Sequence, residues 1–192
     1  MGTDPSTGRQ DGWVRTLCLL RHAKSSWSDP SLGDHERPLA PRGRRAATRI
    51  ARYANSQRIR PELVLCSSAL RARQTLEPLR PDFRPGAEVR FDDDLYGASA
   101  DELLGSLRAV NGRIASVLLV GHNPGLEDLA TILASDGEPL AMELLRAKFP
   151  TGALAILDLG STTWARLRPG AAYLARLVLP RELPVEADEH PV

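Results

Sequence analysis

Cysteine is scarce in this sequence, with 2 residues in a chain of 192. Cys18 and Cys66 each end an apolar run and have no CxxC spacing, which excludes a disulfide framework and a cysteine-rich metal site. We interpret both as buried free thiols of a reducing compartment rather than as catalytic or redox cysteines. A chain of this length needs no disulfide, because it buries about 70% of the surface that it exposes when unfolded.

Long apolar runs are also missing. No stretch reaches the roughly 18 consecutive apolar residues of a membrane helix, and the polar N-terminus lacks the apolar core of a signal peptide. We therefore expect a cytoplasmic protein with no membrane partner.

Net charge is nearly absent as well, since 25 basic residues face 24 acidic ones. Bulk charge therefore gives no reason to expect a nucleic-acid partner. The distribution is uneven, because residues 37–90 carry 13 Arg against 4 acids and residues 91–143 carry 10 acids against 2 Arg. Two interpretations stay open: mutually paired, solvated helix faces, or a basic lobe that holds an anion.

Short apolar runs alternate with helical patterns along most of the chain. Strands joined by helices of 10 to 15 residues are typical of βαβ units around a sheet that is buried on both faces. Near the end, short runs joined by turns (153–159, 164–167 and 172–180) favour antiparallel strands. The sequence thus predicts a three-layer α/β/α fold whose central sheet is mostly parallel with an antiparallel edge. The other expected strands are 16–20, 62–66 and 116–120, and the expected helices are 44–55, 70–79, 99–110, 125–134 and 141–149.

The two ends of the chain lack periodic apolar residues. We expect a disordered tail over residues 1–12, one domain over 13–182, and a second tail over 183–192.

Two of the four histidines occupy equivalent places. His22 follows the first predicted strand and His122 follows a later one. Open α/β sheets bind ligands at the carboxyl ends of their strands, so these two imidazoles are the first candidates for a site. His35 and His190 give no such signal.

Arginines stand at the same kind of position. Arg21 directly precedes His22, and Arg71 follows the second predicted strand near the start of a helix. A guanidinium group placed there can donate two parallel hydrogen bonds to two oxygens of one phosphate. The repulsion between Arg21, Arg71 and an imidazolium would also favour the neutral, nucleophilic form of His22. The pattern indicates phosphoryl transfer, and these residues do not have the spacing of metal ligands.

The motifs that carry these residues resemble the histidine phosphatase superfamily, whose fold is that of the phosphoglycerate mutases. Within it they are most similar to the SixA-like phosphohistidine phosphatases. The resemblance covers nearly the whole predicted domain, through six segments in order: LLRHAKSSW (19–27), DHERPLAPRG (34–43), SSALRARQT (67–75), VGHNPG (120–125), PTGALAIL (150–157) and LPREL (179–183).

The resemblance implies that His22 accepts the phosphoryl group as a covalent phosphohistidine, while Arg21, Arg71 and His122 bind it. The superfamily signature usually continues with Gly and then Glu or Gln, whereas this chain has Ala23 and Lys24. Lys24 either adds a positive charge for the phosphate or points into solvent.

The proton donor is less clearly marked. Many relatives place a carboxylate after the third strand, and the matching segment contains Asp92, Asp93 and Asp94. Asp94 is the predicted acid, and a solvated loop or helix cap is the other interpretation of this run. Asp34 and Arg37 belong to the family-like pattern, and we expect them to anchor the loop before the helix that begins near residue 43.

We predict a phosphatase that acts on phosphohistidine, carried on a phosphotransfer protein, and uses no metal or other cofactor. Its site would hold a phosphate ion, and we expect a monomer. A small-molecule phosphomonoester phosphatase or mutase of the same superfamily is the alternative. A phosphate-binding module without turnover is a third.

Overall fold

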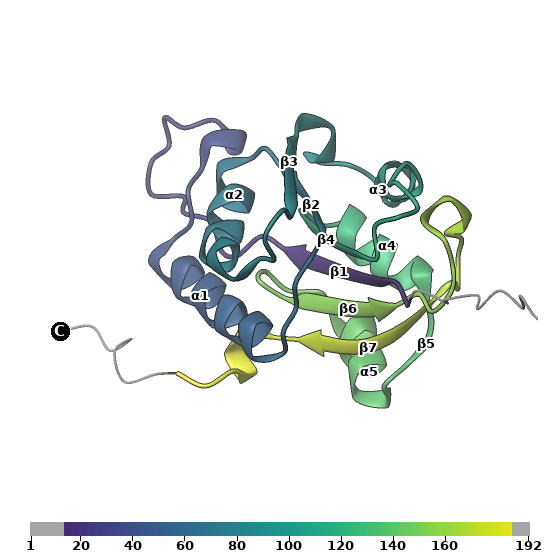
Figure 1. Cartoon of the computed structure of the whole chain (residues 1–192). Coiled ribbons are helices and arrows are strands. Elements are labelled where there is room, and N and C mark those ends of the chain that lie inside the picture. Colours follow the sequence, from purple (N-terminus) through teal and green to yellow (C-terminus); the bar gives the residue numbers. More distant parts are fainter. Residues whose placement is uncertain (1–13, 186–192) are drawn as a thin grey trace, which may run out of the picture.

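The computed structural model describes residues 14–185, in which five α-helices and seven strands form the body of the fold (Figure 1). The predicted tail over 1–12 and residues 186–192 of the other lie outside this range. The strands are β1 (Thr16–Arg21), β2 (Leu63–Ser67), β3 (Glu88–Asp92), β4 (Ser116–Gly121), β5 (Ala134–Gly137), β6 (Leu154–Asp158) and β7 (Ala172–Val178). The helices are α1 (Pro41–Ser56), α2 (Leu70–Leu76), α3 (Ala100–Arg108), α4 (Gly125–Leu133) and α5 (Pro139–Ala147). Short 3-10 helices are η1 (Asp34–Glu36), η2 (Glu77–Asp82), η3 (Asp93–Leu95), η4 (Trp164–Arg166) and η5 (Pro180–Glu182).

The seven strands form one sheet in the order β3-β2-β4-β1-β6-β7-β5. Strands β3, β2, β4 and β1 pair in parallel, and β5 pairs in parallel with β7. Only β6 runs against its neighbours, since its pairings with β1 and β7 are antiparallel. The predicted mostly parallel sheet with an antiparallel part is confirmed.

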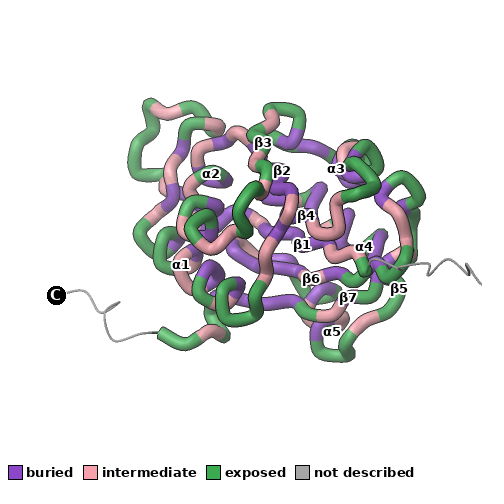
Figure 2. The backbone as a smooth tube through the Cα atoms, viewed as in Figure 1, coloured by how far each residue is buried: buried purple, intermediate pink, exposed green. Residues whose placement is uncertain are grey.

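The central strands are apolar on both faces and are covered on both. Leu17 and Leu19 of β1 pack with α3, α4 and α5, whereas Cys18 and Leu20 pack with α1 and α2. Successive side chains of a strand point to opposite faces, so a continuous apolar run must be buried between two helical layers. Figure 2 shows the buried positions concentrated along these strands. The three-layer α/β/α prediction is confirmed.

One predicted strand is wrong. Residues 164–167 begin with a turn of 3-10 helix, η4, because Trp164 is fully buried and its indole Nε1 donates to Ile114 O at 2.7 Å. Two strands were also missing from the prediction. Strand β3 (EVRFD) does alternate polar and apolar residues, but it is short and largely exposed, whereas β5 has the sequence ASDG and no apolar pattern that would indicate a strand.

Helix α1 begins against the segment that follows β1. Gly43 packs on the backbone of Lys24, and a Cβ at this position would overlap the Lys24 carbonyl oxygen. The amide of Ala40 also donates to Lys24 O at 2.9 Å. These contacts fix the start of α1 beside His22. Within residues 14–185, no helix combines the length and the apolar character that crossing a bilayer requires.

Candidate active site

The two strand-end histidines meet at the carboxyl edge of the sheet. Strands β1 and β4 are hydrogen-bonded neighbours, with Arg21 opposite Gly121, so the next residues, His22 and His122, lie side by side. Their ring centroids are 4.9 Å apart, and both residues are buried. Arg71, near the start of α2, reaches the same point. Three of the four residues expected to carry or bind the phosphoryl group therefore meet directly. We call the set of four the cationic cup: Arg21, His22, Arg71 and His122.

Hydrogen bonds define the tautomer of His22. Its Nδ1 lies 2.8 Å from Ala23 O, a carbonyl that can only accept, so Nδ1 carries the proton. Nε2 then has the free electron pair in the neutral ring, and Arg71 Nε donates toward it at 3.4 Å. Burial, with smaller contributions from Arg71 and Arg21, lowers the pKa of His22 from 6.5 to about 4. His22 is therefore a neutral imidazole at pH 7 with Nε2 as its nucleophilic atom.

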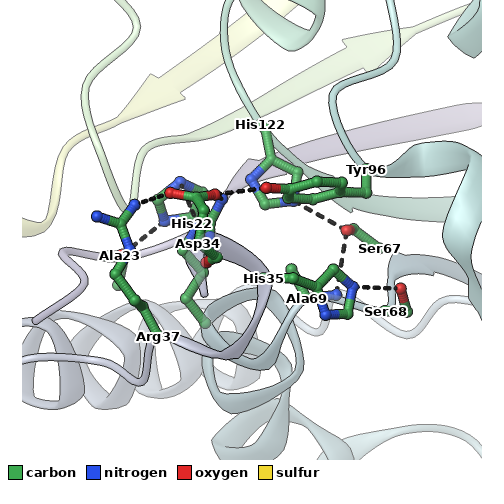
Figure 3. A network of polar contacts seen from close by, with 11 residues as sticks. His22, Ala23, Asp34, His35, Arg37, Ser67, Ser68, Ala69, Tyr96 and His122 are labelled. Atoms are coloured by element: carbon green, nitrogen blue, oxygen red, sulfur yellow. Dashed lines mark hydrogen bonds and ion pairs between the residues drawn. The ribbon is translucent and has the colours of Figure 1, made fainter. Parts of the chain in front are cut away.

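His122 has one partnered and one unpartnered nitrogen. Its Nε2 lies 2.9 Å from Ser67 Oγ, and Ser67 Oγ accepts from the amide of Ala69 at 3.4 Å (Figure 3). The Ser67 hydroxyl can donate to Nε2 in the tautomer that carries the His122 proton on Nδ1. That nitrogen is buried and has no hydrogen-bond partner among the described residues. Burial and the neighbouring His22 and Arg71 lower the pKa of His122 to about 3.

The carboxylate of Asp34 lies beside the cup. Arg71 Nη2 donates to Asp34 Oδ2 at 2.9 Å, and Nη1 donates to Asp34 O at 2.5 Å. Arg37 forms an ion pair with the other carboxylate oxygen, and the Tyr96 hydroxyl donates to Oδ2 at 2.5 Å. These donors lower the pKa of Asp34, with the Tyr96 hydrogen bond as the largest cause. Asp34 is therefore an ionised carboxylate held by three side chains.

The remaining walls come from aromatic side chains. The ring of Tyr96 lies edge-on to His122, with centroids 5.4 Å apart, and to His35, at 5.0 Å. His35 Nε2 contacts Ser68 Oγ at 2.8 Å. The guanidinium of Arg37 lies 3.3 Å from the centre of the exposed Trp27 ring. Figure 3 shows Asp34 between Arg37 and Tyr96, next to His22 and His122.

Arg21 is fixed by the loop before β6. Its Nη1 donates to Phe149 O at 2.8 Å, and burial lowers its pKa. Arg21 also lies close enough to His22 to lower the pKa of the imidazole. All four residues of the cationic cup thus lie close enough to influence one another electrostatically.

Two predicted site residues lie elsewhere. Asp94 is exposed in η3, and its carboxylate forms no hydrogen bond or ion pair with the cup residues in the described range. The same segment reaches the cup through Tyr96 instead. The half-buried Lys24 lines a neighbouring groove together with Arg42 and Arg45. The roles predicted for Asp94 and Lys24 stay predictions.

Sequence reasoning missed three residues of this site, Tyr96, His35 and Ser67. His35 and Ser67 lie inside two of the matched segments, 34–43 and 67–75, and Tyr96 follows the run of three Asp, but no pattern within these segments set the three residues apart. Asp34 and Arg37 were expected only to anchor a loop, although their spacing of three residues is one that ion pairs favour. That loop is indeed anchored, and its anchor is the ion pair with Arg71.

The chemistry of the donors favours an anion. Within residues 14–185, no group of three or more His, Cys, Asp or Glu side chains is placed to hold a metal ion. The guanidinium of Arg71 and the hydroxyl of Tyr96 converge on the Asp34 carboxylate, as they would on a phosphoryl group. The site therefore belongs to an α/β protein in which a neutral histidine lies beside a carboxylate held by guanidinium and hydroxyl donors.

The chain belongs to the histidine phosphatase superfamily (branch 1), whose family model matches residues 17–122. Members of this superfamily are phosphatases. An uncharacterised protein of Mycobacterium tuberculosis is 38% identical over 164 residues, which span 84% of this chain and all of that protein.

Two solved structures are similar in sequence and in fold. One is described as a candidate phosphohistidine phosphatase SixA from Nakamurella multipartitia; it is 34% identical with a TM-score of 0.75, over 87% of this chain and 96% of that one. The other has the same description and comes from Agrobacterium tumefaciens; it is 33% identical with a TM-score of 0.73, over 86% of this chain and 98% of that one. The predicted family and its fold are confirmed.

Proposed function

We propose that this protein is a phosphohistidine phosphatase that acts on a phosphotransfer protein through a covalent phosphohistidine on His22. The observation that carries the proposal is the pairing of a neutral nucleophile with an ionised carboxylate. His22 has its free electron pair on Nε2, whereas Asp34, the carboxylate at the cup, is held by Arg71, Arg37 and Tyr96. Such a carboxylate has no proton to give, so the site suits a leaving group that needs little help from an acid.

In the first step, His22 Nε2 attacks phosphorus and the bond from phosphorus to the substrate imidazole breaks. The electron pair of that bond stays on the substrate nitrogen, and a substrate ring that carries a proton on its other nitrogen leaves as neutral imidazole, while His22 keeps its own proton on Nδ1. The exchange is nearly symmetric, because one imidazole replaces another. Arg71 and Arg21 would neutralise the phosphoryl oxygens during transfer.

In the second step, water attacks the phosphorus bound to His22. The bond to Nε2 breaks, its electron pair returns to the ring, and the proton lost by water leaves with the phosphate or the solvent. With its proton on Nδ1, His122 would donate to a phosphoryl oxygen, which would satisfy a buried nitrogen that has no hydrogen-bond partner within residues 14–185.

A phosphomonoester makes a stronger demand on the site. Its alkoxide leaving group needs a proton donor, and Asp94 is exposed and makes no contact with the cup. The two solved structures described as candidate phosphohistidine phosphatases, at 34% and 33% identity, support the same substrate class.

We place the protein in the cytoplasm and expect it to act as a monomer, without metal. Cys18 and Cys66 are both free and buried, which supports a reducing compartment. Burial raises the pKa of each thiol to about 12, so neither is a nucleophile at neutral pH.

Phosphate release tests this function. Free phosphohistidine, a phosphohistidine peptide and a panel of phosphomonoesters are offered to the wild type and to His22→Asn, with a chelator present. We expect rapid release from the phosphohistidine compounds, its loss in His22→Asn, and an acid-labile phosphoryl adduct on the wild type only. Arg166→Gln, an exposed change in η4, is the control for handling and folding.

Turnover of monoesters alone would give the function to the small-molecule phosphatase. Saturable phosphate binding without any release would favour the binding module. Normal release by His22→Asn would overturn the mechanism.

A further inference from the structure

A basic groove lies next to the cationic cup. Its volume is about 540 Å³, within the range of ligand sites, and it is formed between α1, η5 and the loop before β6. Among residues 14–185, no acidic side chain lines it, whereas five cationic ones do: Lys24, Arg42, Arg45, Arg49 and Arg181. Its floor contains apolar groups, among them Ala46 and Leu179.

Three of these arginines form a row. Arg42, Arg45 and Arg49 follow one another at spacings of three and four residues, which places them on one face of α1 over about 10 Å. Arg42 and Arg45 are exposed, and neither forms an ion pair with an acid in residues 14–185. A row of charges beside an open groove is suited to an extended anion rather than to a single compact one.

The groove and the cup share a wall. Gly152 N lies 3.1 Å from both Arg21 O and His22 O, and donates to them, while the preceding Pro150 and Thr151 line the groove. Lys24 follows His22 closely in the chain and also lines the groove. Gly43 of α1 packs on the backbone of Lys24. A polypeptide whose phosphohistidine enters the cup would thus have its neighbouring residues within reach of the groove.

We propose that this groove binds an acidic segment of the protein that carries the phosphohistidine. The inference rests on the proposed function and adds to it the chemistry of the partner. Carboxylates of the segment would pair with Arg42 and Arg45, and the methylene groups of its Glu side chains would lie on the apolar floor. The partner is therefore a protein with Asp and Glu residues beside its phosphorylated histidine.

Two synthetic peptides test the partner chemistry. Both carry one histidine phosphorylated with phosphoramidate; in one it is flanked by Glu on both sides, and in the other Gln replaces every Glu. Free phosphohistidine is the third substrate. The enzymes are the wild type, the double variant Arg42→Glu/Arg45→Glu, and the matched control Arg166→Glu/Arg168→Glu, whose changes lie in η4 and the exposed turn after it.

We expect the wild type to prefer the Glu peptide to the Gln peptide by about tenfold in kcat/KM at low salt, through its KM, and to lose this preference at high salt. The Arg42→Glu/Arg45→Glu variant should lose the preference and keep its turnover of free phosphohistidine. The control should behave as the wild type.

Equal kcat/KM for the two peptides with the wild type would overturn the inference and leave the function intact. An equal loss on free phosphohistidine and on the Glu peptide in the double variant would also overturn it, because the arginines would then act on the cup itself. If no phosphohistidine compound is hydrolysed, the proposed function fails. Fluorescence anisotropy of the unphosphorylated Glu peptide then tests the groove alone, since binding to the wild type and not to the double variant would still support it.

Discussion

Arg71 and Asp34 are joined twice, through the carboxylate at 2.9 Å and through the backbone carbonyl at 2.5 Å. The third nitrogen of the same guanidinium, Nε, points to His22 Nε2 at 3.4 Å. All three guanidinium nitrogens of Arg71 are therefore engaged, two by Asp34 and one by His22. A phosphoryl group that enters the cup must compete with Asp34 for this arginine.

Replacing Asp34 by Asn should strengthen the binding of inorganic phosphate. The amide keeps the shape of the side chain but removes the negative charge from Arg71 and Arg37, so the entering oxyanion meets less repulsion. We expect the inhibition constant for phosphate to fall about tenfold, which corresponds to about 1.4 kcal/mol. The measurement is product inhibition of phosphohistidine hydrolysis.

Asp101→Asn is the matched control for Asp34→Asn, because Asp101 is an exposed carboxylate on α3. It should leave phosphate inhibition as in the wild type. An unchanged or weaker affinity for phosphate in Asp34→Asn would show that Asp34 does not occupy the position of the substrate anion.

Stability should decline as the pH falls from about 6.5 toward 4. The pKa values of His22 and His122 are lowered from 6.5 to about 4 and about 3 in the folded protein. Below pH 6.5 the unfolded chain protonates these histidines, whereas the folded chain keeps them neutral. Their contribution to the free energy of unfolding is therefore complete above pH 6.5 and is lost as the pH falls through the folded pKa values. Urea unfolding at about pH 7.5, 6 and 5 would measure the decline.

His22→Asn should reduce this pH dependence, because it removes one of the two depressed imidazoles. The variant and the wild type are compared over the same pH range, with ring ¹⁵N shifts of His22 followed in the wild type. A His22 that gains a proton near pH 6.5 in the folded protein would contradict the prediction.

The sequence predicted the cup residues that lie at strand ends: His22 and His122 directly follow β1 and β4, and Arg71 lies in the first turn of α2, shortly after β2. His22, His122 and Arg71 were found because parallel strands bring their carboxyl ends to one edge, and that rule needs only the positions of the strands. Tyr96 and Asp34 enter from loops, whose path depends on packing that no periodicity encodes. Strand β5 was missed for a similar reason, since the sequence ASDG pairs with β7 without an apolar pattern of its own.

Asp94→Asn should leave phosphohistidine hydrolysis within about twofold of the wild type. Asp94 is exposed, and in the proposed reaction the leaving imidazole needs little acid catalysis. The measurement is kcat on free phosphohistidine, with any residual phosphomonoester turnover followed in parallel. A loss of about a hundredfold on phosphohistidine would restore Asp94 as the proton donor.

Thr75→Val should destabilise the protein and impair the site together. The fully buried Thr75 hydroxyl accepts from Ala23 N at 2.9 Å and donates to Arg71 O at 2.6 Å, so it ties the segment after His22 to α2. Valine has a similar shape but leaves the buried Ala23 amide without a partner, at a cost of about 1–3 kcal/mol. Denaturant unfolding measures this loss, and kcat should fall as well.

Thr131→Val is the control for Thr75→Val, because Thr131 is an exposed threonine on α4 whose hydroxyl donates only within its own helix. It should change the free energy of unfolding by less than about 0.5 kcal/mol. Equal effects of the two substitutions would argue against a tie between His22 and α2.

The hydrogen bond between His22 Nδ1 and Ala23 O makes the two nitrogens of one ring unequal. A histidine can carry phosphate on either nitrogen, and the two products are distinct positional isomers. On this protein only the isomer substituted at Nε2 can form while the ring keeps its anchor to the backbone. In the proposed reaction, the main-chain carbonyl of Ala23 therefore determines which positional isomer of phosphohistidine forms on His22.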